Sequence, residues 1–162
     1  MPTFQALGNI GEFVGAIGVV VTLVYLAREM GQNTRSVRAA SFNSMSENSI
    51  RLLEHAFRDS EFAQFLARAE NDPAALTTAE CVRWDAYMTA VFRHFGNLVY
   101  QRRVGALDEG MWQSYARTLK EHLRARSWAE WYRSHAHLFS RSLTLQVERT
   151  LRELEEEAAA RR

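Results

Sequence analysis

Lysine, cysteine, proline and glycine are all scarce in this 162-residue sequence. Cys81 is the only cysteine, which excludes an internal disulfide framework and any cysteine-rich zinc or iron–sulfur site. Two prolines and eight glycines leave few helix breakers, so the composition favours helices. An excess of either charge is also lacking, because 20 basic and 19 acidic residues leave a net charge of +1. So small a charge gives no strong field for attracting nucleic acid, and we expect no nucleic-acid partner.

The apolar content is sufficient for a folded domain. Hydrophobic residues make up 47% of the sequence and charged residues 24%, which excludes a disordered or low-complexity tail. No alternating apolar and polar pattern of useful length is present, whereas apolar residues recur at helical spacing over most of the chain. The length suits one modest domain. The sequence therefore predicts an all-α fold.

The longest uncharged run lies near the N-terminus. Residues 13–27 (FVGAIGVVVTLVYLA) carry no charge, and extension back to Leu7 gives about 21 residues interrupted only by Glu12. As a helix this segment is roughly 31 Å long, close to the thickness of a bilayer's hydrocarbon core. Its large apolar residues contribute roughly −3 to −5 kcal/mol toward membrane insertion. We therefore predict a transmembrane anchor over residues 1–30, the alternative being a buried core helix of a soluble protein.

Basic residues around this run predict its orientation. Residues 1–12 contain no lysine or arginine, and no small-residue cleavage site follows the run, so we expect a retained anchor rather than a signal peptide. Arg28, Arg35 and Arg38 follow the run closely, and the positive-inside rule therefore places residues 31–162 in the cytoplasm. The expected location is the bacterial inner membrane, crossed once, with the N-terminus outside.

Small residues line one face of the predicted span. They recur at steps of three and four residues and include a GxxxG pattern, which lets another helix approach closely in lipid. The alternative is that glycine is simply frequent in membrane helices. We expect contact with an integral-membrane partner, or with a second copy of the chain, through this face. Its five positions are Gly8, Gly11, Gly15, Gly18 and Thr22.

Helix signals continue beyond the span. Thr77-x-x-Glu80 and Ser127-x-x-Glu130 have the spacing of capping boxes, and Gly105 stands where a helix-ending glycine is expected. Together with the apolar periodicity, these signals predict a cytoplasmic bundle of about five helices as a second domain. Expected helices cover residues 32–58, about 60–70 and about 78–104, with others beginning near Asp108, Ser127 and Ser140.

Several segments match the pattern of a known group of proteins. Residues 11–35 read GEFVGAIGVVVTLVYLAREMGQNTR, and the pair Trp131-Tyr132 precedes Phe139. These segments resemble an uncharacterised bacterial family of singly anchored helical proteins, and the resemblance covers nearly the whole chain. It implies the same single-span helical architecture but no activity, since the family has none assigned. Gly96 departs from the pattern, because many family members have a glutamate there. Further matching positions are Phe95, Asn97, Tyr100, Gln101, Gly105, Leu107, Asp108 and Trp112.

Polar side chains gather on the expected helix over residues 78–104. At steps of four and then three residues, Arg93, Asn97 and Tyr100 share one helix face. Such a group can line a small pocket, or it can form a buried network that fixes helix packing. The candidate pocket residues are Arg93, Asn97, Tyr100, Gln101 and Asp108.

Signals for metal, cofactor or nucleophilic chemistry are weak. None of the five histidines lies in the predicted span, so an axially ligated haem or pigment is not expected there. His135-x-His137 has a metal-like spacing, but side chains two positions apart on a helix diverge, which favours an ordinary surface pair. Cys81 is expected to be a small buried residue, and the aromatic residues over 128–132 to form core or a docking surface. We expect neither a metal nor a cofactor.

Two functions remain open. The lack of a recognisable catalytic motif and the small-residue face favour a non-catalytic, membrane-anchored interaction protein, an accessory or stabilising subunit of a larger integral-membrane complex. The alternative is a membrane-tethered enzyme or small-ligand-binding module that uses the face of Arg93, Asn97 and Tyr100. The expected partners are membrane lipid and either an integral-membrane protein or a second copy of the chain.

Overall fold

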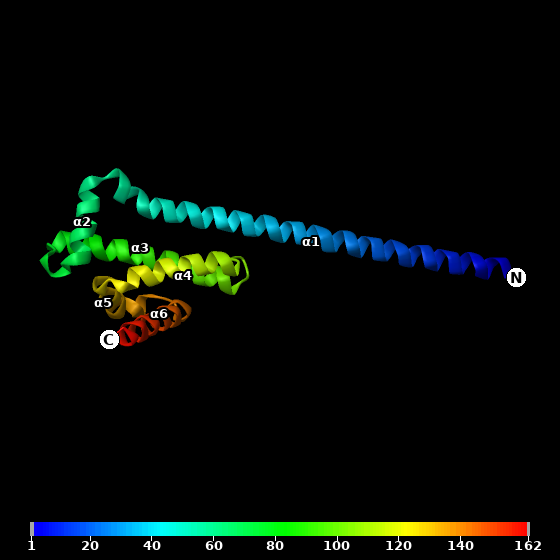
Figure 1. Ribbon diagram of the computed structural model, residues 1–162. Coiled ribbons are helices and arrows are strands. Elements are labelled where there is room, and N and C mark those ends of the chain that lie inside the picture. Colours follow the sequence, from blue (N-terminus) through cyan, green and yellow to red (C-terminus); the bar gives the residue numbers. More distant parts are fainter. Residues whose placement is uncertain (1, 162) are drawn as a thin grey trace. The chain divides into compact units, whose positions relative to one another are not determined.

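The computed structural model describes the backbone of residues 2–161 and their side chains apart from positions 2–14, 16, 35, 41 and 55–57. Over residues 2–161 the chain forms six α-helices and two short 3-10 helices, and no strand (Figure 1). The predicted all-α class is therefore confirmed. The α-helices are α1 (Pro2–Arg58), α2 (Ser60–Asn71), α3 (Thr78–Arg103), α4 (Glu109–Arg124), α5 (Arg126–His135) and α6 (Arg141–Ala160), with 3-10 helices at Pro73–Ala75 and Ala136–Leu138.

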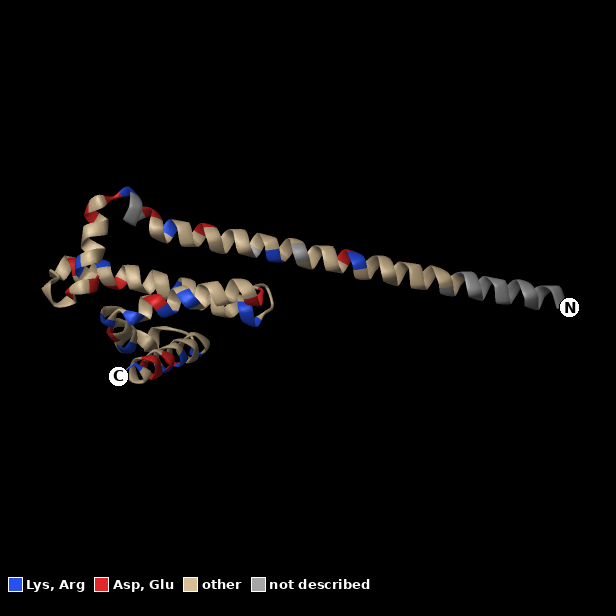
Figure 2. Ribbon diagram, in the orientation of Figure 1, with Lys and Arg blue, Asp and Glu red and all other residues tan. Residues whose placement is uncertain are grey.

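The chain divides into two compact units, Met1–Ala40 and Ser41–Arg162. The first unit is the N-terminal part of α1, which continues through the junction where the sequence predicts an anchor followed by a separate helix. No proline interrupts residues 28–40, so every residue there keeps the backbone N–H that a continuous helix requires. Figure 2 shows no charged residue on the described part of α1 before Arg28.

The predicted membrane span is only partly covered by the described side chains. Among those side chains, no helical stretch combines the length and hydrophobicity needed to cross a membrane. The first part of the predicted span, residues 7–14 and Ala16, lies outside them. The span therefore stays a prediction. Its second part carries large apolar side chains that are 47–64% exposed: Ile17, Val19, Val20, Val21, Leu23, Val24, Tyr25 and Leu26.

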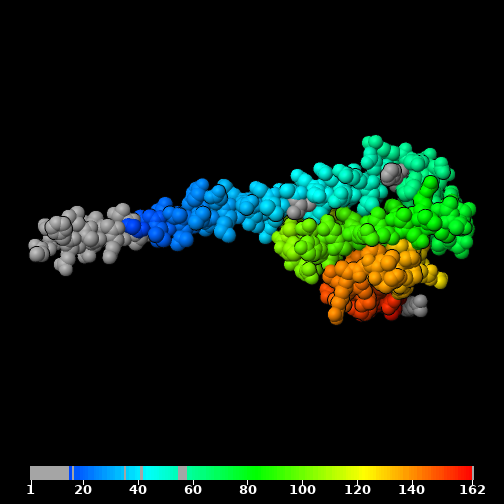
Figure 3. Space-filling view, turned by 180° about the vertical axis from the view of Figure 1, so that it is seen from behind, coloured from blue at the N-terminus to red at the C-terminus, as the bar shows by residue number. Residues whose placement is uncertain are grey.

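The second unit is a helical bundle with α3 at its centre. Helix α3 packs against α4 and α6, while α5 contacts α2 and α4. In the view of Figure 3, the side chains of α3 (green) and of the segment from α5 to α6 (orange) meet without a hollow between them. The core contains fully buried side chains from α1 to α6, among them Met45, Phe65, Met88, Phe92, Leu98, Leu119, Trp128, Tyr132, Leu143 and Val147.

The aromatic residues of α5 form the densest part of this core, which confirms one of the two roles expected for residues 128–132. The polar atom of each of the three large side chains also forms a hydrogen bond with a side chain of another helix. Trp128 donates its indole N–H to Glu70 at 2.9 Å, and Trp131 donates to Asp85 at 2.6 Å. The hydroxyl of Tyr132 lies 3.2 Å from that of Thr144. The rings are thus anchored as structural side chains rather than arranged as a cage.

The helix ends around α3 follow the predicted signals. The Glu80 backbone N–H donates to the Thr77 hydroxyl at 3.3 Å, and the Thr77 backbone N–H donates to the Glu80 carboxylate at 2.9 Å, which confirms the capping box. Gly105 has φ +74°, and its N–H donates to the Arg102 carbonyl at 3.0 Å. Asp108 then accepts the N–H of Met111 at 2.9 Å and begins α4. The turn between α3 and α4 is therefore encoded locally.

The second predicted capping box is wrong. Helix α5 begins at Arg126, one residue before Ser127, and its cap residue Ala125 has no side chain able to accept. Because α4 ends at Arg124, only Ala125 separates the two helices, so Ser127 falls inside the first turn of α5. The Ser127 hydroxyl is buried without a hydrogen-bond partner among the described residues. Glu130 forms an ion pair with Arg126 at 2.6 Å instead.

Candidate functional site

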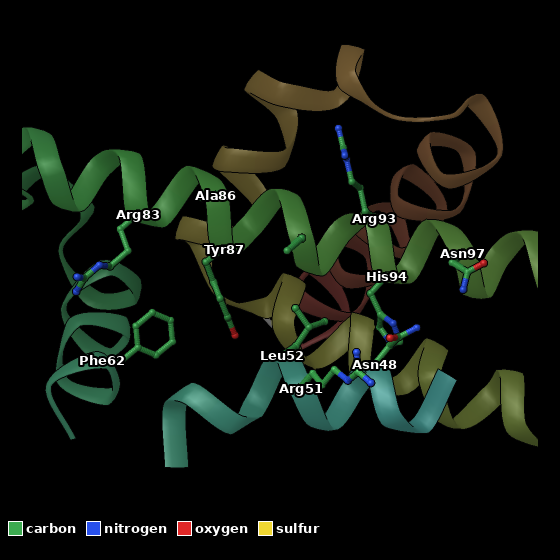
Figure 4. A pocket seen from close by; sticks show the side chains of 11 residues that line it. Asn48, Arg51, Leu52, Phe62, Arg83, Ala86, Tyr87, Arg93, His94 and Asn97 are labelled. Carbon is green, nitrogen blue, oxygen red and sulfur yellow. The ribbon is translucent and has the colours of Figure 1, made fainter. Parts of the chain in front are cut away.

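A groove of about 630 Å³ runs along α3 in the second unit (Figure 4). Its walls come from the C-terminal part of α1, from Phe62 of α2 and from one face of α3. Ala86 and Ala90 lie four residues apart on that face, and their small side chains leave the space that a larger residue would fill. Leu52 and Tyr87 complete an apolar floor.

The groove carries a positive charge. Of the eleven described residues that line it, three are arginines and none is acidic. The guanidinium of Arg51 lies 4.0 Å from the carboxylate of Glu47, and both side chains are largely exposed, so this pair neutralises little of the charge. The Arg83 guanidinium lies 5.5 Å from the ring centre of Phe65 and keeps its charge. In Figure 4, the Arg93 side chain extends away from the α1 segment.

A hydrogen bond between α1 and α3 borders the groove. Nε2 of His94 lies 2.9 Å from the Ser49 hydroxyl, and the same hydroxyl donates to the Met45 carbonyl at 3.0 Å. This contact connects α1 to α3.

A smaller hollow of about 240 Å³ shares Leu52, Tyr87 and His94 with the groove. It is mainly apolar, and it contains His122, whose ring stacks on Trp128 with 4.2 Å between ring centres. Burial lowers the pKa of His94 and that of His122 below 6.5, although the Glu70 carboxylate opposes the shift at His122. Both rings are therefore held neutral in the folded state at neutral pH.

The pH dependence of stability follows from these two rings. A histidine whose pKa is lowered by folding contributes stability that is complete above its unfolded pKa of 6.5 and is lost as the pH falls below it. We expect the free energy of unfolding, measured by urea titration, to fall between about pH 7 and pH 5. Glu80 titrates later, since the Thr77 backbone N–H, helped by the Arg68 and Thr77 side chains, lowers its pKa from 4.5 to about 2.

A matched pair of variants tests the assignment of this pH effect. His94→Gln together with His122→Gln removes the buried imidazoles and should flatten the dependence between pH 7 and pH 5. His137→Gln alters an exposed histidine and should leave the slope as in the original chain. An unchanged slope in the double variant would assign the effect to other groups.

The polar residues predicted from the sequence do not form one cluster. Arg93 and Asn97 both line the groove. Tyr100 is 50% exposed and lies under the Arg103 guanidinium, with 5.6 Å between that group and the ring centre. The Gln101 backbone carbonyl accepts the N–H groups of Ala106 and Leu107 in the turn after α3, and the Asp108 carboxylate caps α4. The groove therefore contains two of the five predicted residues, while backbone groups occupy the Gln101 carbonyl and the Asp108 carboxylate.

Sequence reasoning missed the larger part of the groove. Arg83, Tyr87 and Ala90 precede Asn97 on the same face of α3, and this spacing was readable as one stripe. The opposite wall was not readable, because Arg51 and Leu52 come from a helix that is separated from α3 by α2. Pairing of distant helices depends on tertiary packing rather than on local spacing.

The small-residue face of α1 is described in part. Gly8 and Gly11 lie outside the described side chains. A Cβ atom placed on Gly15 or Gly18 would meet no atom within 4 Å, so the described half of this face is open. The Thr22 hydroxyl donates to the Gly18 carbonyl at 2.8 Å within the same helix.

The remaining candidates for chemistry have structural partners. No group of histidine, cysteine and acidic side chains suited to a metal occurs among the described residues. The His135 ring stacks on Trp131 at 4.2 Å, and its Nδ1 lies 2.9 Å from the Trp131 carbonyl. The predicted burial of Cys81 is wrong, because this residue in the first turn of α3 is exposed, with its sulfur 3.9 Å from the Leu76 carbonyl.

Comparisons with protein-family models, curated proteins and solved structures gave no match to this chain. The resemblance of residues 11–35 to a bacterial family of singly anchored proteins therefore stays a prediction. The groove and the exposed apolar segment of α1 are the observations from which a function is argued.

Proposed function

We propose that this chain is a non-catalytic, membrane-anchored interaction protein that serves as an accessory or stabilising subunit of a larger integral-membrane complex. The observation that carries the proposal is the exposed apolar surface of α1. Val19, Val20 and Val21 are each 59–62% exposed although they point to three different sides of one helix. A helix that is apolar on every side is typical of a membrane span or a buried core helix.

The free energy of insertion supports lipid as the surroundings of this segment. Seven large aliphatic residues between Ile17 and Leu26 contribute roughly −2 to −4 kcal/mol on the insertion scale. Residues 7–16 would extend the segment to a length that matches the hydrocarbon core. Exposed to water, the same surface would be an aggregation liability.

The proposed orientation puts the helical bundle on the cytoplasmic side of a bacterial inner membrane. Arg28, Arg35 and Arg38 follow the apolar segment, and the residues before it contain no lysine or arginine. The positive-inside rule retains such basic clusters in the cytoplasm.

Cysteine accessibility tests this topology. A cysteine at Thr3 should react with a membrane-impermeant maleimide in intact cells, and one at Ala158 should react only after lysis. Both variants would be made in a Cys81→Ser background, because Cys81 is exposed. The reverse pattern of labelling would contradict the orientation.

The small-residue face supplies the proposed contact with a partner helix. Gly15 and Gly18 are open in this chain, and without side chains they permit a second helix to approach closely. Gly15→Leu combined with Gly18→Leu keeps the segment apolar and should preserve insertion. The added bulk should separate the backbones and abolish the larger species on a native gel in mild detergent.

The control for that experiment places the same bulk elsewhere on the helix. Ala16→Leu combined with Ala27→Leu lies away from the glycine face and should leave the larger species intact. If the original chain and both double variants migrate as one monomeric species, the subunit proposal fails and ligand binding becomes the leading function.

A second candidate function is a membrane-tethered ligand-binding module. The groove favours it, because its lining includes three arginines and no acidic residue beside an apolar floor.

A further inference from the structure

The groove along α3 has the size of a small-ligand site. It runs from Arg83 to Asn97, which corresponds to about 21 Å of helix. Its volume of about 630 Å³ lies within the range of about 300–1,000 Å³ that is typical of small-molecule pockets.

The helical walls of the groove do not suit an extended peptide. An added peptide strand gains its affinity from unpaired backbone groups at a sheet edge. Here the walls are helices, whose N–H and C=O groups are paired within each helix. The floor offers the side chains of Leu52, Tyr87, Ala86 and Ala90, which suit a hydrocarbon.

Polar side chains border the apolar floor at both ends of the groove. Phe62 and Ala86 lie toward one end, where the Arg83 guanidinium faces the ring of Phe65. Figure 4 shows Asn48 and Arg51 together on α1 toward the other end, near His94 of α3. Asn48 and Arg51 beside the apolar floor are complementary to an amphiphile with one apolar chain and one anionic head.

We propose that the groove binds a long-chain fatty-acid anion. Its carboxylate accepts hydrogen bonds from the Arg51 guanidinium and the Asn48 amide, and its chain lies over Ala90 and Ala86 toward Phe62. An acyl chain that spans half of a hydrocarbon core of about 30 Å is about 15 Å long, which fits the groove. This inference rests on the second unit alone and does not require the proposed membrane anchor.

Photolabelling of the full-length protein tests the site. The protein, in phosphatidylcholine nanodiscs, is mixed with a palmitate analogue that carries a diazirine in its chain, irradiated and digested. We expect adducts in the peptide that spans residues 83–97, suppressed by excess oleate and not by oleyl alcohol. Failure of the chain to enter nanodiscs would count against the anchor alone, and the same labelling would then be done in buffer.

Matched variants test separately the contribution of the apolar floor and that of the arginine charge to binding. Ala90→Leu fills the floor and should lower adduct formation about tenfold, whereas Ala79→Leu, on α3 but outside the groove, should not. Arg51→Gln should lower it about tenfold through loss of the charged hydrogen bonds, whereas Arg152→Gln on α6 should not. Near-UV circular dichroism verifies that each variant is folded.

Three results would overturn the proposal. The first is the absence of adducts on residues 83–97 in the folded original chain. The second is equal suppression by oleyl alcohol and oleate, which would show a groove that does not recognise the anion. The third is suppression by lysophosphatidylglycerol without suppression by oleate, which would assign the groove to a phospholipid.

Discussion

Arginines in place of Val20 and Leu23 are expected to release this chain from the membrane. Both residues lie in the middle of the exposed apolar segment of α1, with 59% and 60% of their surfaces exposed. Each arginine at the centre of a span costs about 2.5–3.5 kcal/mol on the insertion scale. The favourable contribution of the valine or leucine that it replaces is lost as well. Together, two arginines cost more than the roughly 3–5 kcal/mol by which the whole segment favours insertion. Carbonate extraction of cell membranes should find the original chain in the pellet and the double variant in the supernatant.

The matched control moves the same two substitutions along the helix. Met30 and Val37 are also apolar and exposed on α1, at 70% and 54%, but they follow the first basic residue of the predicted flank. Met30→Arg combined with Val37→Arg should leave the chain in the pellet, because it adds basic residues on the side that retains them. Extraction of the original chain by carbonate, or equal behaviour of the two double variants, would contradict the proposed anchor.

Local signals in the sequence were sufficient to predict the helices and several of their ends. The reciprocal bonds of Thr77 and Glu80 are made within four residues, and the positive φ of Gly105 needs only the absence of a side chain. Asp108 likewise caps the helix that it precedes. Such features depend on neighbours in the chain, so spacing alone reveals them.

Features set by packing between distant helices were not predictable in this way. Ser127 has the spacing of a cap, but the tight junction between α4 and α5 starts the helix earlier and buries the hydroxyl. The groove is a second example, since Arg51 reaches it from a helix that precedes α2. Among the polar residues predicted on α3, Gln101 lies near the C-terminus of the helix. Its backbone carbonyl accepts hydrogen bonds from the turn to α4, because Gly105 ends the helix there.

Phe92→Ala is expected to cause the largest loss of stability in the helical bundle. Phe92 is fully buried, and its ring lies 4.7 Å from that of Tyr132 and 5.8 Å from that of Trp131, between ring centres. Removing such a ring loses both its burial and its contacts, and leaves a cavity that typically costs about 3–5 kcal/mol. A domain with about 5–15 kcal/mol of total stability would then melt about 10–20 °C lower.

The measurement is thermal unfolding followed by near-UV circular dichroism, which reports the tryptophans packed around Phe92. Val82→Ala is the control, because Val82 lies on the same helix and is 66% exposed, so its loss should change the stability by less than about 0.5 kcal/mol. A melting temperature unchanged by Phe92→Ala would contradict the described core.

Since Phe92 does not line the groove, folded Phe92→Ala protein at low temperature should retain the photolabelling of residues 83–97. This result would distinguish the stability of the bundle from the binding of a ligand.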